Sequence, residues 1–205
     1  MNDFLPADYK VPTDSKYMKF QQGSNRFRIL GSFANQTAIM GYEYWKSGEE
    51  GKRTPVRVMM GVNIPMTDLE ESEQTGELDM PKHFWAFPVY NWNEERVQIL
   101  EITQKSVMNG IKDLARNKSW GDPAEYDLVV TQTGQQLKTK YSVVPNPKEK
   151  LPPEVQVKVK ATPVNIVALF SGEDPFKTPA TENVEPEEIE SGMEKARKAA
   201  EATKK

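Results

Sequence analysis

Aromatic side chains are concentrated in one short segment, residues 82–92. The segment holds five of the chain's 19 aromatic residues (four Trp, seven Tyr and eight Phe). These five are Phe84, Trp85, Phe87, Tyr90 and Trp92. A strand places alternate side chains on opposite faces, so rings at this density lie on both faces. One face fills a core, and the rings of the other are candidates for stacking on a flat group such as a nucleobase.

Basic side chains offer a second kind of chemistry, because Lys and Arg can neutralise phosphates. The net charge is −3, yet residues 16–60 hold eight Lys or Arg and three Asp or Glu, whereas residues 61–81 hold six Asp or Glu and no Lys or Arg. Such segregation is a better sign of a charged partner than the total charge. The candidates for binding a nucleic acid are Arg26, Arg28, Tyr42, Tyr44, Trp45, Lys46, Lys52, Arg53, Arg57, Lys82, Trp85, Tyr90, Trp92, Lys138 and Lys140.

Three of these candidates carry a more specific expectation. Arg28 alternates with Phe27 and Ile29, so its side chain should point away from the core. Trp92 stands at the end of its strand and is a better stacking candidate than the dense cluster before it. Tyr42 and Tyr44 share one face of their strand with Trp45 opposite, and for these faces core packing and base stacking both remain open.

Catalytic and metal chemistry find little support in the sequence. The chain has no Cys and a single His, His83, which excludes disulfides, thiolate metal sites and a His-rich zinc site. Neither GxxxxGK[ST] nor GxGxxG is present. We therefore expect no enzyme activity, metal or cofactor, although the many carboxylates leave a two-metal nuclease open as an alternative. No apolar run approaches the ~20 residues needed to span a bilayer, so we expect a soluble intracellular protein.

The elements that must position these residues are mostly strands. Period-two alternation and turn signals predict a mainly β fold with one helix over 105–119. For 164–170 a short helix and a strand both fit. The expected strands are 25–30, 38–45, 56–60, 82–92, 96–103, 126–133, 137–144 and 155–161.

This pattern, without βαβ alternation, favours a small antiparallel barrel of the OB-fold type with one amphipathic helix. We expect a flexible arm over 1–16, the binding domain over 17–170, and an acidic to mixed-charge flexible tail over 171–205 that could be helical near 187–202. The acidic stretch 68–79 has two interpretations. It is a solvated loop, or it imitates phosphates and competes for the basic groove.

Several strings in consistent order carry a family resemblance over about residues 17–150. They are GSNRFRILGSF, GYEYW, FWAFPVYNWNEERVQILEITQKS and WGDPAEYDLVVTQTGQQLKTKYSVVPNP. The chain resembles the single-stranded DNA-binding proteins of tailed bacteriophages, relatives of the T-even helix-destabilising protein. The resemblance implies an OB-fold that binds single strands without sequence preference in phage DNA replication, recombination and repair, in the cytoplasm of the infected bacterium.

Two departures from that family pattern stand out. The T-even protein carries a structural zinc, and this chain lacks its ligands. Family members commonly end in an acidic tail that recruits replication proteins; here Glu182–Glu190 is acidic but the chain ends in Lys204-Lys205. Contact with replication or recombination proteins through the tail remains an expectation. The alternative functions are a metal-dependent nuclease or recombination enzyme, or a replisome adaptor, of a phage replication cluster.

Overall fold

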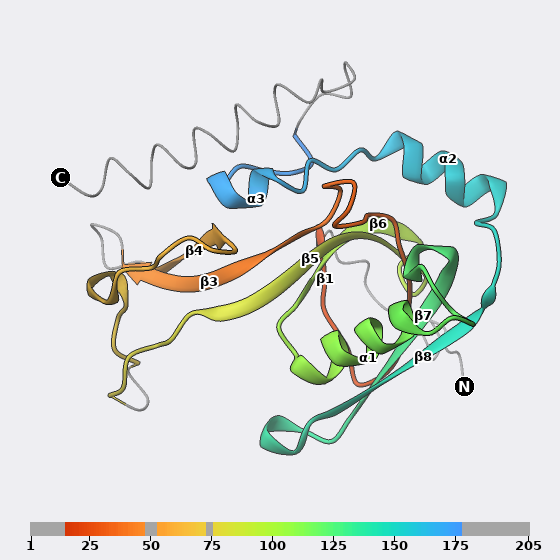
Figure 1. The fold of residues 1–205 in the computed structure, drawn as a ribbon. Coiled ribbons are helices and arrows are strands. Elements are labelled where there is room, and N and C mark those ends of the chain that lie inside the picture. Colours follow the sequence, from red (N-terminus) through yellow and green to blue (C-terminus); the bar gives the residue numbers. More distant parts are fainter. Residues whose placement is uncertain (1–14, 48–52, 73–75, 178–205) are drawn as a thin grey trace, which may run out of the picture.

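Eight strands in one mixed sheet form the body of the protein. The computed structural model describes residues 15–47, 53–72 and 76–177, and Figure 1 shows the arrangement. The strands are β1 Tyr17–Met18, β2 Gly23–Ile29, β3 Ile39–Ser47, β4 Arg53–Met59, β5 Lys82–Asn91, β6 Arg96–Ile102, β7 Tyr126–Thr133 and β8 Lys140–Lys148. The helices are α1 Lys105–Arg116, α2 Pro153–Ala161 and α3 Ala168–Ser171, with single 3₁₀ turns at Met66–Asp68, Pro123–Glu125 and Gln136–Lys138.

Strand β5 organises the sheet because it changes partner half-way along one edge. Its first half, 82–86, pairs with β3, and its second half, 89–91, pairs with β2. Along its other edge it pairs with β6. The main path runs β1-β6-β5-β2-β7-β8, with β4 attached only through β3. The hairpin of β3 and β4, called the arm below, therefore extends away from α1, β7 and β8 (Figure 1).

Gly31 lets the chain leave β2 and turn towards β3. A Cβ at this position would lie 2.1 Å from the carbonyl oxygen of Thr37, closer than any side chain can approach. The turn is closed by hydrogen bonds from the amides of Thr37 and Ala38 to the Ser32 carbonyl. The residues of this turn thus sit beside the junction of β2, β3 and β5.

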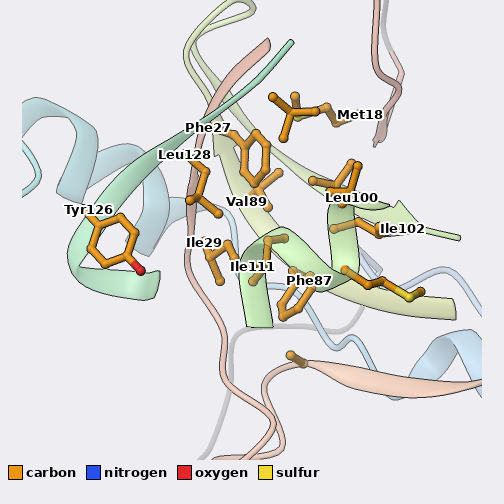
Figure 2. Close-up of a cluster of buried hydrophobic side chains, with 14 residues drawn as sticks. Met18, Phe27, Ile29, Phe87, Val89, Leu100, Ile102, Ile111, Tyr126 and Leu128 are labelled. Carbon is orange, nitrogen blue, oxygen red and sulfur yellow. The ribbon is translucent and has the colours of Figure 1, made fainter. Parts of the chain in front are cut away.

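The larger core lies between the sheet and α1. Phe87 and Val89 of β5 lie near Ile111 of α1, with Phe27 and Leu128 beside them (Figure 2). Each such side chain, when fully buried, contributes roughly 1.5–3 kcal/mol. α1 packs closely against β8 at Gly110, which has no Cβ; a Cβ added there would lie 2.8 Å from Cγ2 of Val143.

The opposite face of the sheet is covered by α2 and α3 (Figure 1). Phe84 and Ile99 pack there with Ile166 and Leu169, and Tyr90 packs with Val155 of α2. The chain continues in contact with this face beyond residue 170. Asp174 pairs with Lys16 at 2.5 Å, so both ends of the described fold meet here.

Most predicted elements are confirmed, and the helix over 105–119 is α1. The predicted strand 155–161 is wrong, because this segment is helix α2. Its valines alternate in sequence, but Val155 and Val159 lie one helical turn apart and face the sheet, while Val157 is exposed. The segment 164–170 ends in the short helix α3. Strand β8 begins at Lys140, later than predicted, after a 3₁₀ turn.

The predicted mainly β class is confirmed, but the small antiparallel barrel predicted from the strand pattern is wrong. The sheet is open, with β4 and β8 each paired to one strand only, and β1 runs parallel to β6. Closure requires the edge strands to meet, but the β3–β4 and β7–β8 hairpins diverge (Figure 1). None of the helices in the described ranges combines the length and apolar character that crossing a membrane requires.

Candidate nucleic-acid interface

An open, mostly apolar pocket lies where α1 meets the base of the arm. Its volume is about 260 Å³. Phe33 from the turn after β2, Met40 of β3 and Trp85 of β5 contribute to its walls, with Ile111 from α1. The pocket exists because α1 covers only part of its face of the sheet, and the arm continues beyond it.

Trp85 is held firmly in this pocket. The Phe33 ring meets it edge-on with centroids 5.5 Å apart. The indole Nε1–H donates to Nε2 of His83 at 3.1 Å, and Nδ1 of His83 lies 2.9 Å from the Gly41 carbonyl oxygen. Both hydrogen bonds form when Nδ1 carries the proton and Nε2 accepts. A ring fixed in this way is pre-organised for contact with a second flat group, because little side-chain freedom remains to be lost.

Two cations of α1 stand on the rim of the pocket. Lys112 and Arg116 are one helical turn apart and both line it. Lys112 donates to the Asn109 side chain at 2.9 Å. Among the described residues, neither cation pairs with a carboxylate. The rim also carries Asp122, whose Oδ1 accepts a hydrogen bond from the Ala124 amide.

The aromatic surface continues from the pocket along the arm. Met40, Tyr42 and Tyr44 alternate onto the same face of β3, and Tyr42 is in register with His83, their rings 5.4 Å apart. Tyr42 is half-buried, whereas Tyr44 is only 7% exposed. Burial, with the charge of Asp68, raises the pKa of the Tyr44 phenol. Tyr42 therefore extends the aromatic surface, whereas the buried Tyr44 contributes only to packing.

A second group of predicted residues lies on the opposite face of the sheet. Asp127 accepts from Arg26 at 2.5 Å and from Arg28 at 2.7 Å. Arg28 does point away from the main core, as its alternation predicts, but it is buried and also donates to the Glu149 carbonyl, so it is unavailable to phosphates. Tyr90 is likewise buried, in the cluster under α2.

Trp92 shares this second face rather than the pocket. The guanidinium of Arg26 lies 4.6 Å above its ring, and the ring meets Tyr90 edge-on. One ring face is therefore already covered by a cation, which weakens the expectation that Trp92 is the best stacking residue.

The cations of the arm are engaged by carboxylates. Arg57 pairs with Glu43 at 2.9 Å and with Glu101 at 2.8 Å. Burial raises the pKa of Glu101, and the positive charge of Arg57 opposes that rise. Trp45 is half-buried and alternates onto the same face as Glu43. Lys46, Arg53 and Lys82 each pair with the acidic segment before β5.

The remaining predicted cations lie apart from the pocket. Lys138 and Lys140 are exposed near the end of the β7–β8 hairpin, and within the described part of the chain neither forms an ion pair. Between them and Gly134 stands Leu137, which is fully exposed. Lys52 lies outside the described residues.

The sequence-based candidates omit most of the pocket. Trp85 is the only one of them that lines it, whereas Phe33, Met40, Lys112 and Arg116 are absent from the set. The spacing of Lys112 and Arg116 on the polar side of α1 was a usable signal, since residues four apart share a helix face. Nothing in the sequence indicated that Phe33 lies opposite that face.

No family model, curated protein or solved structure matches this chain. Within the ranges that the structure describes, no three Asp, Glu or His side chains are grouped so as to hold a metal ion. The chemistry of the pocket is therefore inferred from its own side chains.

Proposed function

We propose that this protein binds single-stranded DNA without sequence preference, with a base entering the pocket beside Trp85 and the neighbouring phosphates lying against Lys112 and Arg116. The observation that carries the proposal is the pairing of an open aromatic pocket with two rim cations that have no carboxylate partner among the described residues. The resemblance to phage single-stranded DNA-binding proteins supports the same function. On that resemblance, we propose that the activity serves phage DNA replication, recombination and repair.

The balance between base stacking in the pocket and the cost of unstacking a duplex favours a single strand over a duplex. Stacking of a base on an aromatic side chain is worth about 1–3 kcal/mol and tolerates every base, because each has a π-face. In a duplex the bases are already stacked and paired, so entering the pocket costs a few kcal/mol of unstacking. Pockets for drug-sized ligands measure about 300–1,000 Å³, so the 260 Å³ here suits one flat ring system rather than a larger ligand.

The two cations contribute the electrostatic part of the binding. Each phosphate neutralised on a single strand gives a slope of about −0.7 in log affinity against log salt. Lys112 and Arg116 together therefore account for roughly −1.4 of the slope. Tyr42, half-buried beside His83, offers a second ring for the next base along the strand.

Fluorescence titration with oligo-dT across a range of salt concentrations tests this proposal. Binding should quench Trp85, so Trp85→Phe should lose most of the quenching but, because the Phe ring still stacks, only part of the roughly 1–3 kcal/mol of stacking energy. Trp92→Phe is the matched control, because Trp92 lies on the other face beneath Arg26. A titration without any signal at low salt, or loss of binding in the control alone, would refute the proposed site.

Charge variants test the rim separately. Lys112→Ala with Arg116→Ala should reduce the salt slope by roughly 1.4. The control, Lys150→Ala with Lys160→Ala, removes the same charge from exposed positions that form no ion pair within the described ranges. Adding Mg²⁺ to labelled strands in the same experiment distinguishes a binder from a nuclease, since only a nuclease shortens them.

A further inference from the structure

The acidic segment between β4 and β5 places carboxylates on the cations of the arm. Asp68 lies 3.6 Å from Lys46, and Glu70 lies 3.2 Å from Arg53. Asp79 lies 3.5 Å from Arg53 and 3.7 Å from Lys82. The carboxylates of this segment thus pair with Lys46, Arg53 and Lys82, three of the cations predicted from the sequence to contact phosphates.

Glu70 makes the contacts that a phosphate oxygen commonly makes. It accepts hydrogen bonds from the backbone amide of Ser47 and, at 3.0 Å, from the Ser47 hydroxyl, and it faces the guanidinium of Arg53. These hydrogen bonds and the Arg53 charge lower the pKa of the Glu70 carboxyl, so it is an anion at neutral pH. Backbone amides, hydroxyls and Arg side chains are the groups that contact phosphates in protein–DNA complexes.

A phosphate can replace the carboxylates in these ion pairs, because the pairs are partly exposed to solvent. The side chains of Lys46 and Asp68 are 50% and 25% exposed, and those of Arg53 and Glu70 are 33% and 27% exposed. Ion pairs at such partly exposed sites add little to stability, because solvent screens the attraction between the two charges. A phosphate that reaches the arm therefore competes with carboxylates that are held only weakly.

We infer that Asp68, Glu70 and Asp79 occupy phosphate positions on the arm, and that a single strand extends onto the arm only by displacing them. The inference rests on the proposed function. It gives the arm a second backbone-binding site, whose ligand class is the phosphodiester. Lys46 lies on the Tyr42 face of β3, whereas Arg53 and Lys82 are in register with Ser47 and Glu43 on the other face, so the strand passes round the edge of the arm. The site is filled by the chain's own carboxylates when no strand is bound.

The exchange has a measurable consequence for the salt dependence of binding. A cation beside a carboxylate brings no net charge to the strand, whereas a freed cation neutralises a phosphate and releases counterions. Freeing Lys46, Arg53 and Lys82 should steepen the slope by up to about 2, at roughly 0.7 per cation. The variant should then gain up to about 100-fold over the native protein for each tenfold reduction in salt.

The experiment compares oligo-dT affinity across salt for the native chain and the variant Asp68→Asn, Glu70→Gln, Asp79→Asn. The control variant Glu149→Gln, Glu154→Gln, Glu173→Gln removes the same charge at exposed positions whose carboxylates pair with no cation within the described residues. It therefore reports the effect of net charge alone. Urea unfolding of all three proteins shows whether the fold is retained, and Asp68→Asn alone replaces the triple variant if that one unfolds.

The outcomes separate the two proposals. The expected result is that the variant Asp68→Asn, Glu70→Gln, Asp79→Asn shows a steeper salt slope and tighter binding at low salt than the control variant. Binding by all proteins with equal slopes overturns the exchange and leaves the proposed function standing. Absence of binding by the native chain and both variants at low salt overturns the proposed function, and the exchange with it.

Discussion

Gly110 offers a test of how α1 is seated against the sheet, because two opposing effects of a single methyl group can be weighed there. Gly in a helix costs about 0.5–1 kcal/mol relative to Ala. On propensity alone, Gly110→Ala should therefore stabilise the protein by that amount. The structure predicts the opposite sign, since the new Cβ would lie 2.8 Å from Cγ2 and 2.9 Å from Cβ of Val143.

The clash should exceed the gain in propensity. Val143 is branched at Cβ and sits in a strand, so it cannot swing aside cheaply. Forcing an extra methyl into such a contact costs about 1–3 kcal/mol. Gly110→Ala should thus lower the free energy of unfolding by up to about 2 kcal/mol, once the propensity gain of up to 1 kcal/mol is subtracted.

A double-mutant cycle measured by urea denaturation shows whether the clash with Val143 outweighs the gain in helix propensity. In a Val143→Gly background both methyl groups and the Cβ that carries them are gone, and Gly110→Ala should become neutral or stabilising by up to about 1 kcal/mol relative to that background. The change of sign between the two backgrounds is the expected result. Stabilisation by Gly110→Ala in the native background would show that α1 is not held against β8 at this point, and the placement of Lys112 and Arg116 on the pocket rim would lose its basis.

Three further predictions concern stability. Asp127→Asn should cost about 3–5 kcal/mol in urea unfolding, because it leaves the buried guanidinium of Arg28 without its counter-charge. The lowered pKa of Glu70 means that its contribution to stability is present above its ordinary value of 4.5 and is lost as pH falls towards the folded-state pKa; the free energy of unfolding of Glu70→Gln should therefore fall less steeply than that of the native chain as pH is lowered below about 5. Gly31→Ala should destabilise by more than about 3 kcal/mol or prevent folding, since its Cβ would meet the Thr37 carbonyl oxygen at 2.1 Å, and thermal unfolding measures this.

Local patterns in the sequence predicted the strands and the helix well, because alternation and the 3.6-residue period report which side of an element is buried. They failed at 155–161, where Val155, Val157 and Val159 alternate like a strand. Only the prolines at 152 and 153, which suit a helix start, pointed to α2. The sheet's open shape depends on how β5 divides its pairing, which no local pattern encodes.

The candidate site was only partly predictable for a similar reason. The aromatic density at 82–92 identified Trp85, but it could not separate the pocket face from the face that holds Trp92. Arg28 and a surface Arg have the same local pattern, and only the distant chain near Glu149 buries it. The pocket joins side chains from β2's turn, β5 and α1, whose proximity is a property of the fold.

The divided pairing of β5 also decides how the protein can vary. Because the arm joins the sheet only through the first half of β5, residues added beyond Ser47 and Arg53 leave the register of the α1 core unchanged. Each added cross-strand pair lengthens the hairpin by about 3.3 Å. The length of the arm can therefore change while the core under α1 keeps its packing.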